Sequence, residues 1–208
     1  MPDLRFSVSG ARAVSHAMAP LVVLALRLDA SEPVHGVLLR CQIQIDAPRR
    51  PYAVAEEAGL QDLFGDKSRW GTTLKPLLWT TISANVPAFS RETEFGLEVP
   101  CSTDLCVAAA KYFHALQSGE VPLLLLFSGT VFYARPDGAL QAAPISWSRE
   151  ARFSLPLQVL RDAAEACFPN SGFVSLQRET LDKLHRYKTR AGFQTFEQAV
   201  EALLSSAR

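Results

Sequence analysis

The strongest constraint on the fold of this chain is a strict alternation of apolar and polar residues over positions 37–46. The apolar set is Val37, Leu39, Cys41, Ile43 and Ile45. Successive side chains of a β-strand point to opposite faces, so a period of two predicts a strand with one buried face and one wet face. A strand of this kind is typical of an antiparallel sheet.

Further segments have strand character because they are apolar and end at turn residues. They cover residues 4–8, 21–28, 77–86, 92–99, 121–133, 140–147 and 150–155, which makes about eight strands in all. We interpret 21–28 with 37–46 as an antiparallel hairpin, and 77–86 with 92–99 as a second strand pair. Residues 121–133 are apolar on both faces, which predicts a central strand.

One internal helix is predicted over residues 102–118. Thr103 or Asp104 can cap its N-terminus, and Gly119 can end it in the left-handed conformation. Its apolar stripe consists of Leu105, Ala109, Tyr112 and Leu116. A short helix over 54–63 and an exposed loop over 64–76 are also indicated.

From Pro156 onward the pattern is helical. The last helix has a capping-box pattern in Thr195 and Gln198, and Phe196, Val200 and Leu203 are its expected buried stripe. The predicted fold class is therefore α+β and mainly antiparallel β, either one large sheet or, as we favour, a sandwich. We predict a single domain over 1–208, in which residues 1–155 hold the strands and the internal helix, and a helical tail over 156–208 packs on them.

The balance of charges limits the classes of partner. Lys plus Arg and Asp plus Glu number 21 each, so the chain lacks the basic excess that a nucleic-acid binder uses to neutralise phosphates. The longest apolar runs are far shorter than the ~20 residues of a membrane helix. The first residues do not resemble a signal peptide. We expect a cytoplasmic protein with reduced thiols, no bound nucleic acid and no membrane span.

No motif for a nucleophile, a phosphate cradle or a dinucleotide is found, so we expect neither an enzyme nor a cofactor. Cys101 and Cys106 flank the predicted start of the internal helix, with four residues between them. That spacing is at the limit for a zinc site, and a helix N-terminus favours a thiolate. With His114, these cysteines are the metal or thiol-redox candidates; the alternative is that they are small apolar residues of the core.

Four residues are candidates for binding a protein partner. Arg69 and Trp70 lie in the Gly-containing polar segment 64–76, and Trp and Arg are the residues most often found as interface anchors. The alternative is that Trp70 packs on the sheet as part of a lid. Lys111 and His114 are three residues apart, and therefore neighbours on one helix face. That face is either simply solvated or directed at a partner.

Several long stretches are similar to one bacterial family of unknown function: LRCQIQIDAPRRPY, DLFGDKSRWGTTLKPLLWT, VPCSTDLCVAAAKYFHALQSGEVPLLLLFSGTVFY and LDKLHRYKTRAGFQTF. The resemblance spans roughly residues 38–196. This family is encoded near high-affinity, actinobacterial-type nickel–iron uptake hydrogenases. The resemblance implies an accessory role in assembling or supporting the hydrogenase.

Three functional hypotheses follow. The first is a non-catalytic, chaperone-like accessory protein that binds a hydrogenase subunit or a maturation factor. The second is a small metal-handling or thiol-redox protein that uses Cys101 and Cys106, with His114 as a further candidate metal ligand. The third is a permanent structural subunit of a larger complex. The sequence leaves the oligomeric state open.

Overall fold

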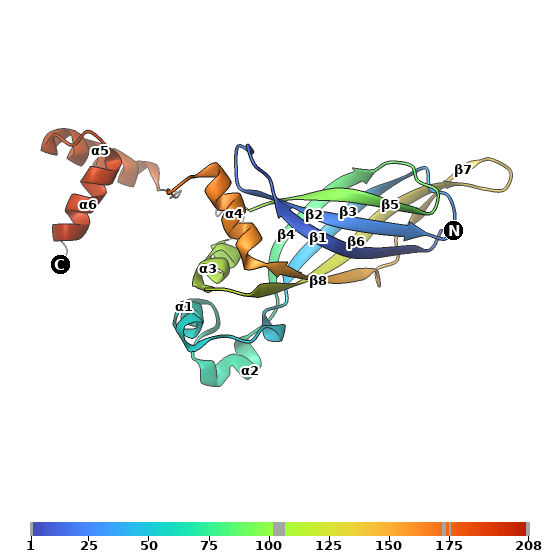
Figure 1. Cartoon of the computed structure of the whole chain (residues 1–208), viewed down its shortest axis with the longest axis horizontal. Coiled ribbons are helices and arrows are strands. Elements are labelled where there is room, and N and C mark those ends of the chain that lie inside the picture. Colours follow the sequence, from blue (N-terminus) through green and yellow to red (C-terminus); the bar gives the residue numbers. More distant parts are fainter. Residues whose placement is uncertain (1, 102–106, 172–173, 175, 207–208) are drawn as a thin grey trace. The chain divides into compact units, whose positions relative to one another are not determined.

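A computed structural model describes residues 2–101, 107–171, 174 and 176–206 of the chain. The chain divides into two compact units, Met1–Ser171 and Gly172–Arg208. The first unit holds the sheets and most of the helices, and the second holds the last two helices (Figure 1). Each unit is described by itself below.

In the described part of the chain, eight strands form two antiparallel sheets, which confirms the α+β class. The smaller sheet has the order β1-β2-β5, with β1 Leu4–Ala13, β2 Leu21–Ala30 and β5 Glu92–Pro100. The larger sheet has the order β4-β3-β6-β7, and β8 also pairs with β6. Its strands are β3 Gly36–Ile45, β4 Leu77–Val86, β6 Glu120–Ala134, β7 Leu140–Pro144 and β8 Glu150–Pro156.

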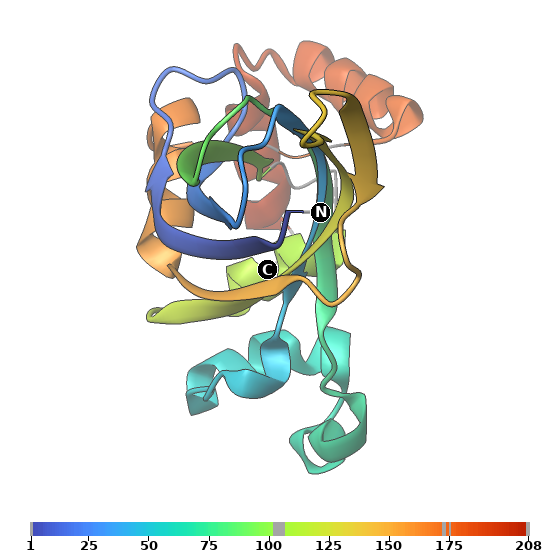
Figure 2. The ribbon, with the colours of Figure 1, turned by 90° about the vertical axis from the view of Figure 1, so that its right-hand side faces the viewer.

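The two sheets enclose one hydrophobic core, so the sandwich is the correct one of the two predicted arrangements (Figure 2). The alternating residues of β3 point inward as expected, and Cys41, Ile43 and Ile45 are fully buried. Phe6 of the smaller sheet stacks on Phe127 of the larger one, with ring centroids 4.2 Å apart. This contact joins the inner faces of the two sheets.

Both predicted strand pairs are wrong in their pairing, although the strands themselves are present. β2 pairs with β1 and β5, whereas β3 pairs with β4 and β6 in the other sheet. In the same way β4 and β5 lie in different sheets. Alternation shows which face of a strand is buried but does not show which strand lies beside it.

β6 is the central strand of the larger sheet, as its apolar character predicted. One edge pairs with β3, and the other edge pairs first with β8 and then with β7. The change of partner occurs at Gly129, which has a φ of +132°. A Cβ atom there would lie 2.0 Å from the carbonyl oxygen of Leu38. Only glycine can hold this close approach of two strands.

The helices of the first unit lie around the sandwich. They are the 3-10 turns η1 Ala47–Arg49 and η2 Lys67–Arg69, and the helices α1 Val54–Phe64, α2 Trp70–Thr73, α3 Val107–Ala115 and α4 Leu157–Cys167. Residues 64–76 are thus not a plain loop, because η2 and α2 occupy their centre. Thr103, Asp104, Leu105 and Cys106 of the predicted internal helix lie outside the described residues. Gly119 has the expected positive φ, at +86°, but it does not end the helix, because α3 already ends at Ala115 and Gly119 lies directly before β6.

The second unit contains α5 Arg178–Ala191 and α6 Phe196–Ser206. Gly192 ends α5 in the left-handed conformation. Thr195 and Gln198 form the predicted capping box: the backbone N–H of Gln198 donates to Thr195 Oγ1, and that of Thr195 to Gln198 Oε1. None of the described helices is both long and apolar enough to span a membrane.

Candidate functional site

The helices α1, η2, α2 and α3 form a layer at one end of the sandwich, which we call the helical platform (Figure 1). The chain enters it through residues 46–53, where Pro48 and Pro51 prevent β3 from continuing. Pro48 lies in the first turn of η1, and Arg50 then returns to extended backbone. The side chain of Arg50 is buried as a result, at 9% exposure for the residue.

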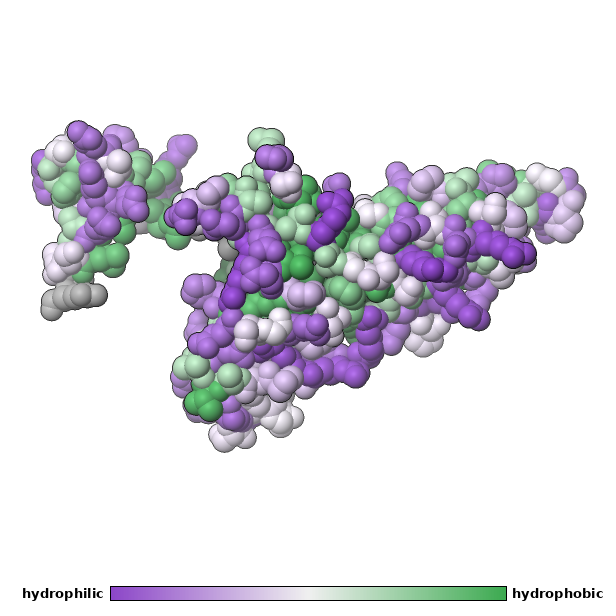
Figure 3. All heavy atoms as spheres, in the orientation of Figure 1, coloured by the Kyte–Doolittle hydropathy of each residue, from purple (hydrophilic) through white to green (hydrophobic). Residues whose placement is uncertain are grey.

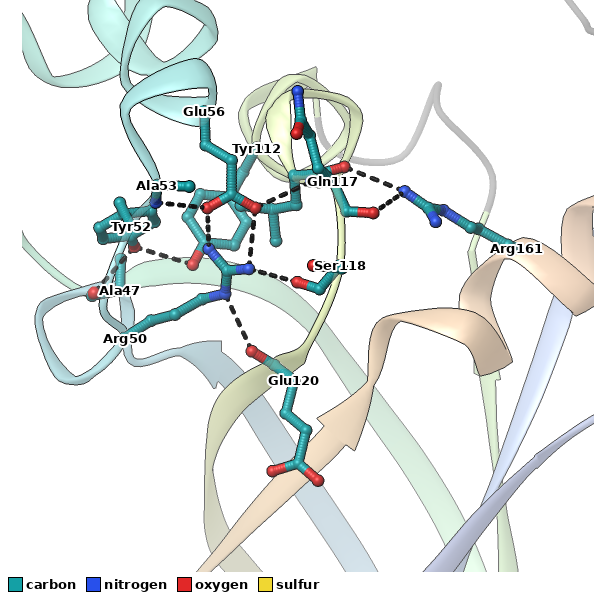
Figure 4. Close-up of polar contacts among 11 residues, drawn as sticks. Ala47, Arg50, Tyr52, Ala53, Glu56, Tyr112, Gln117, Ser118, Glu120 and Arg161 are labelled. Carbon is teal, nitrogen blue, oxygen red and sulfur yellow. Dashed lines mark hydrogen bonds and ion pairs between the residues drawn. The ribbon is translucent and has the colours of Figure 1, made fainter.

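Arg50 forms a buried, bidentate ion pair with Glu56 of α1 (Figure 4). Its Nη1 and Nη2 donate to the two carboxylate oxygens over 2.8 and 3.0 Å. The same guanidinium also donates to the backbone carbonyls of Ser118 and Glu120, over 2.5 and 3.0 Å. Arg50 therefore links α1 to the start of β6.

Glu56 is equally well bonded. Besides Arg50, its carboxylate accepts the backbone N–H groups of Ala53 at 3.1 Å and Gln117 at 2.8 Å. A capping box has two hydrogen bonds. Ala53 has no side-chain oxygen, so only the bond from its backbone N–H to the carboxylate of Glu56 forms at this helix start. Arg50, helped by these N–H donors, lowers the pKa of Glu56 from 4.5 to about 2. The carboxylate is charged and fully engaged near neutral pH.

Two tyrosines extend this network into the aromatic part of the platform. The hydroxyls of Tyr52 and Tyr112 lie 2.9 Å apart, and the Tyr52 hydroxyl also lies 2.8 Å from the carbonyl oxygen of Ala47. Burial raises the pKa of both tyrosines, so both phenols stay protonated. Among the described residues, no buried side-chain nitrogen or oxygen lacks a hydrogen bond. The buried polar groups of this network thus bond to one another and hold the elements together.

Trp70 lies in this aromatic cluster, and Arg69 beside it is exposed. The indole Nε1 donates to the carbonyl of Gly65 at 3.0 Å, and the ring makes edge contacts with Tyr52 and Phe64. Trp70 is half-buried. It packs on Tyr52 and Phe64 of the platform, and the rest of its surface is in solvent.

Lys111 and His114 both lie on the exposed side of α3. Lys111 forms an ion pair with Asp62 of α1, which ties the two helices together across their outer surface. The Lys111 side chain remains 49% exposed. Arg69, Trp70, Lys111 and His114 thus all belong to the helical platform, although they come from two distant parts of the sequence.

Of the two candidate cysteines, the structure describes Cys101. Burial raises the pKa of the Cys101 thiol to about 12, and its Sγ donates to the carbonyl of Val99 at 3.2 Å. Cys106 lies outside the described residues. Within the described ranges, no group of three or more His, Cys, Asp or Glu side chains could hold a metal ion.

Comparison with known proteins gives a family. The family of unknown function DUF6084 matches residues 1–208. The chain belongs to this family. No curated protein matches it.

Two solved structures share a weak likeness with this DUF6084 chain. A Bordetella pertussis protein assigned as ApaA is 15% identical, with a TM-score of 0.30, over 74% of this chain and 94% of that one. A β-glucosidase from Kluyveromyces marxianus is 6% identical, with a TM-score of 0.28, over 74% of this chain and 15% of the enzyme.

Two features of this DUF6084 member were not predicted from its sequence. The first is the Arg50–Glu56 pair, for which the only local hint is an acidic residue in the first turn of α1. The second is Trp147, which lies between β7 and β8 and is 91% exposed. We expected it to be the end of a strand over 140–147, but β7 ends at Pro144.

Proposed function

We propose that this chain is a non-catalytic accessory protein that holds a protein partner on its helical platform. The observation that carries the proposal is the buried Arg50–Glu56 network, which fixes the platform to the sandwich while its outer surface stays open. Arg69, Trp70, Lys111 and His114 belong to that platform.

The rigidity of the platform supports binding. Glu56 bonds to the chain at three places, Arg50, Ala53 and Gln117, and Arg50 bonds to the start of β6. A surface fixed before a partner arrives loses less conformational entropy on binding, so more of the contact energy remains as affinity. The network thus serves recognition by holding the helices in one arrangement.

The exposed composition of the platform also suits an interface. Val54 and Val107 are 81% and 63% exposed, and the platform also exposes the cation Arg69. Interfaces combine apolar contacts with Arg and aromatic anchors, and a polar rim supplies orientation. A partner that presents carboxylates beside apolar side chains would fit this surface.

The partner is a subunit or a maturation factor of a nickel–iron uptake hydrogenase. Support for this step comes from the sequence resemblance, because the similar family is encoded near such hydrogenases. A chaperone-like role in the cytoplasm, as an aid to assembly, is the corresponding function of the chain.

The test is affinity purification of the tagged, full-length chain from its native host. We expect one protein to co-purify in stoichiometric amount, and mass spectrometry to identify it as a hydrogenase subunit or maturation factor. Arg69→Glu should reduce its recovery at least fivefold, because reversal of one interface charge costs on the order of 1–3 kcal/mol and about 1 kcal/mol is a fivefold change in affinity.

The matched control is Arg135→Glu, which reverses an exposed charge in the turn between β6 and β7. It should leave the recovery unchanged. Equal recovery with both variants would remove the platform from the proposal, and a stoichiometric partner outside the hydrogenase system would remove the assignment of the partner. Size-exclusion chromatography of native lysate separates transient holding from the permanent-subunit alternative, which requires all of the chain to run with the complex.

A further inference from the structure

The second unit leaves apolar side chains uncovered. In α6 the apolar residues Phe196, Ala199, Val200 and Leu203 follow the i, i+3, i+4, i+7 spacing of a helix stripe. Of the described residues in this unit, Ala199 is the one that is buried. The other three are 39–42% exposed, and Leu204 is 65% exposed. The expectation that this stripe is buried is therefore wrong.

α5 covers only one side of α6. The rings of His185 and Phe196 meet edge to face with centroids 5.8 Å apart, and Tyr187 lies tilted against Phe193 of the turn between the helices, at 5.9 Å. Lys188 Nζ lies 5.4 Å from the Phe196 ring centroid. On α5 itself, Leu181 remains 44% exposed. Figure 3 shows hydrophobic atoms among the polar ones at the surface of this unit.

A pair of helices this small needs further cover. Chains below about 40 residues rarely bury enough apolar surface to fold alone, and this unit spans only residues 172–208. Helical stability in proteins comes mostly from the packing of an apolar face. The exposed stripe is the face that such packing would use.

The charges of the two helices are opposite. α5 carries five basic residues, Arg178, Lys183, Arg186, Lys188 and Arg190, against two acidic ones. α6 carries Glu197 and Glu201 and no Lys or Arg. Among the described residues of the two helices, these charges form no ion pair.

A surface with one basic and one acidic helix is complementary to its own copy. In a dimer with a twofold axis, each contact between two different surfaces is made twice. If α5 of one chain lies along α6 of its partner, α6 of the first chain lies along α5 of the partner. The lengths also suit this arrangement, since α5 and α6 are about 21 and 17 Å long at 1.5 Å per residue. The apolar stripes would then meet at the centre, as in a four-helix bundle.

We propose that the α5–α6 pair is a self-association module, which docks on the same pair of a second copy of this chain. The interface buries the stripe of α6 and Leu181, and places the cations of α5 against Glu197 and Glu201 of the other copy. This assignment goes beyond the holding of a partner, because it concerns a different surface.

The experiment measures the mass of the purified full-length chain by light scattering after size exclusion, from about 100 µM down to about 1 µM. We expect twice the 22.8 kDa of one chain. Val200→Asp combined with Leu203→Asp should shift the dimer dissociation constant upward by at least tenfold. The matched control is Leu140→Asp in the first unit, where Leu140 is 65% exposed, and it should leave the mass unchanged.

An exchange of charges between two chains still tests the proposal if the double Asp variant loses its helices. One chain carries Glu197→Lys and Glu201→Lys, and a second chain carries Arg178→Glu and Arg186→Glu. Each alone should dimerise at least tenfold more weakly, and their mixture should form the heterodimer. A monomeric wild type, a dimer that survives all these variants, or a mixture without recovery would each overturn the proposal.

Partner capture distinguishes this inference from the proposed function. Val200→Asp with Leu203→Asp should still recover the protein held by the helical platform. Loss of the dimer with retained capture supports both proposals separately. A stable dimer without any captured protein would contradict the proposed function alone.

Discussion

At the scale of single residues, the Arg50–Glu56 pair is the most consequential interaction of the first unit. Its two members have side-chain exposures of 6% and 3%, and each is bonded to backbone as well as to the other. Burial of two charges costs desolvation free energy, and the pair is tolerated because the remaining hydrogen bonds of both groups are also made. Removal of one member should therefore cost much more than removal of both.

We expect Arg50→Met to lower the free energy of unfolding by about 3–5 kcal/mol, because it leaves Glu56 buried without its counter-ion. Arg50→Met combined with Glu56→Leu should lose clearly less. Urea unfolding followed by circular dichroism measures both, with Arg12→Met as the control at an exposed strand position. A single variant as stable as the double variant would show that the pair is not essential.

The same pair gives a defined dependence of stability on pH. The pKa of Glu56 is lower in the folded chain than its ordinary value of 4.5. Its contribution is therefore complete above pH 4.5 and is lost as the pH falls towards about 2, because the unfolded state binds the proton first. Between these values the stability of the wild type should fall more steeply than that of Glu56→Gln, as read from urea midpoints at each pH. Parallel curves would contradict this account.

Cys101 tests the thiol-redox alternative, with the buried Cys41 as a reference. Burial raises the pKa of both thiols to about 12, so very little thiolate exists at pH 8. We expect iodoacetamide to leave both unmodified in the folded chain and to modify both in guanidinium, as followed by peptide mass spectrometry. Rapid modification of Cys101 in the folded chain would restore the alternative.

At the scale of elements, the junction of β3 and β6 depends on Gly129. Gly129→Ala would place a Cβ 2.0 Å from the backbone carbonyl of Leu38, at a φ that alanine rarely adopts. We expect a loss of roughly 3 kcal/mol or more in the free energy of unfolding. Gly10→Ala in β1 is the control, since nothing lies within 4 Å of its Cβ. Equal unfolding midpoints for the two variants would refute the argument.

The elements also show how far the sequence could predict the structure. The alternation in β3 and the apolar character of β6 identified their buried faces, because those patterns follow directly from burial. The pairing of β2 with β5 could not be predicted, since it depends on contacts between residues about 70 positions apart. The platform is a similar case: Arg69 and Lys111 were identified separately, but the Arg50–Glu56 pair that fixes their helices depends on how α1 meets the start of β6.

At the scale of the whole molecule, the core determines which part of the chain can fold alone. The hydrophobic core cluster of buried residues begins at Leu4 and ends at Ala163, so all its members belong to the first unit. The Arg50–Glu56 network lies there too. The first unit therefore contains, within its own residues, the burial that a domain of its size needs.

We expect a chain truncated after Ser171 to fold cooperatively, with a thermal midpoint within about 3 °C of the full-length chain, because no member of the core is removed. Differential scanning calorimetry measures the midpoint and the enthalpy. The truncated chain should also be monomeric, since it lacks α5 and α6, and should still recover a partner that binds the helical platform. A truncated chain that fails to fold would mean that residues beyond Ser171 contribute to the stability of the sandwich. In that case the two units would have to be treated as one domain, as the sequence alone suggested.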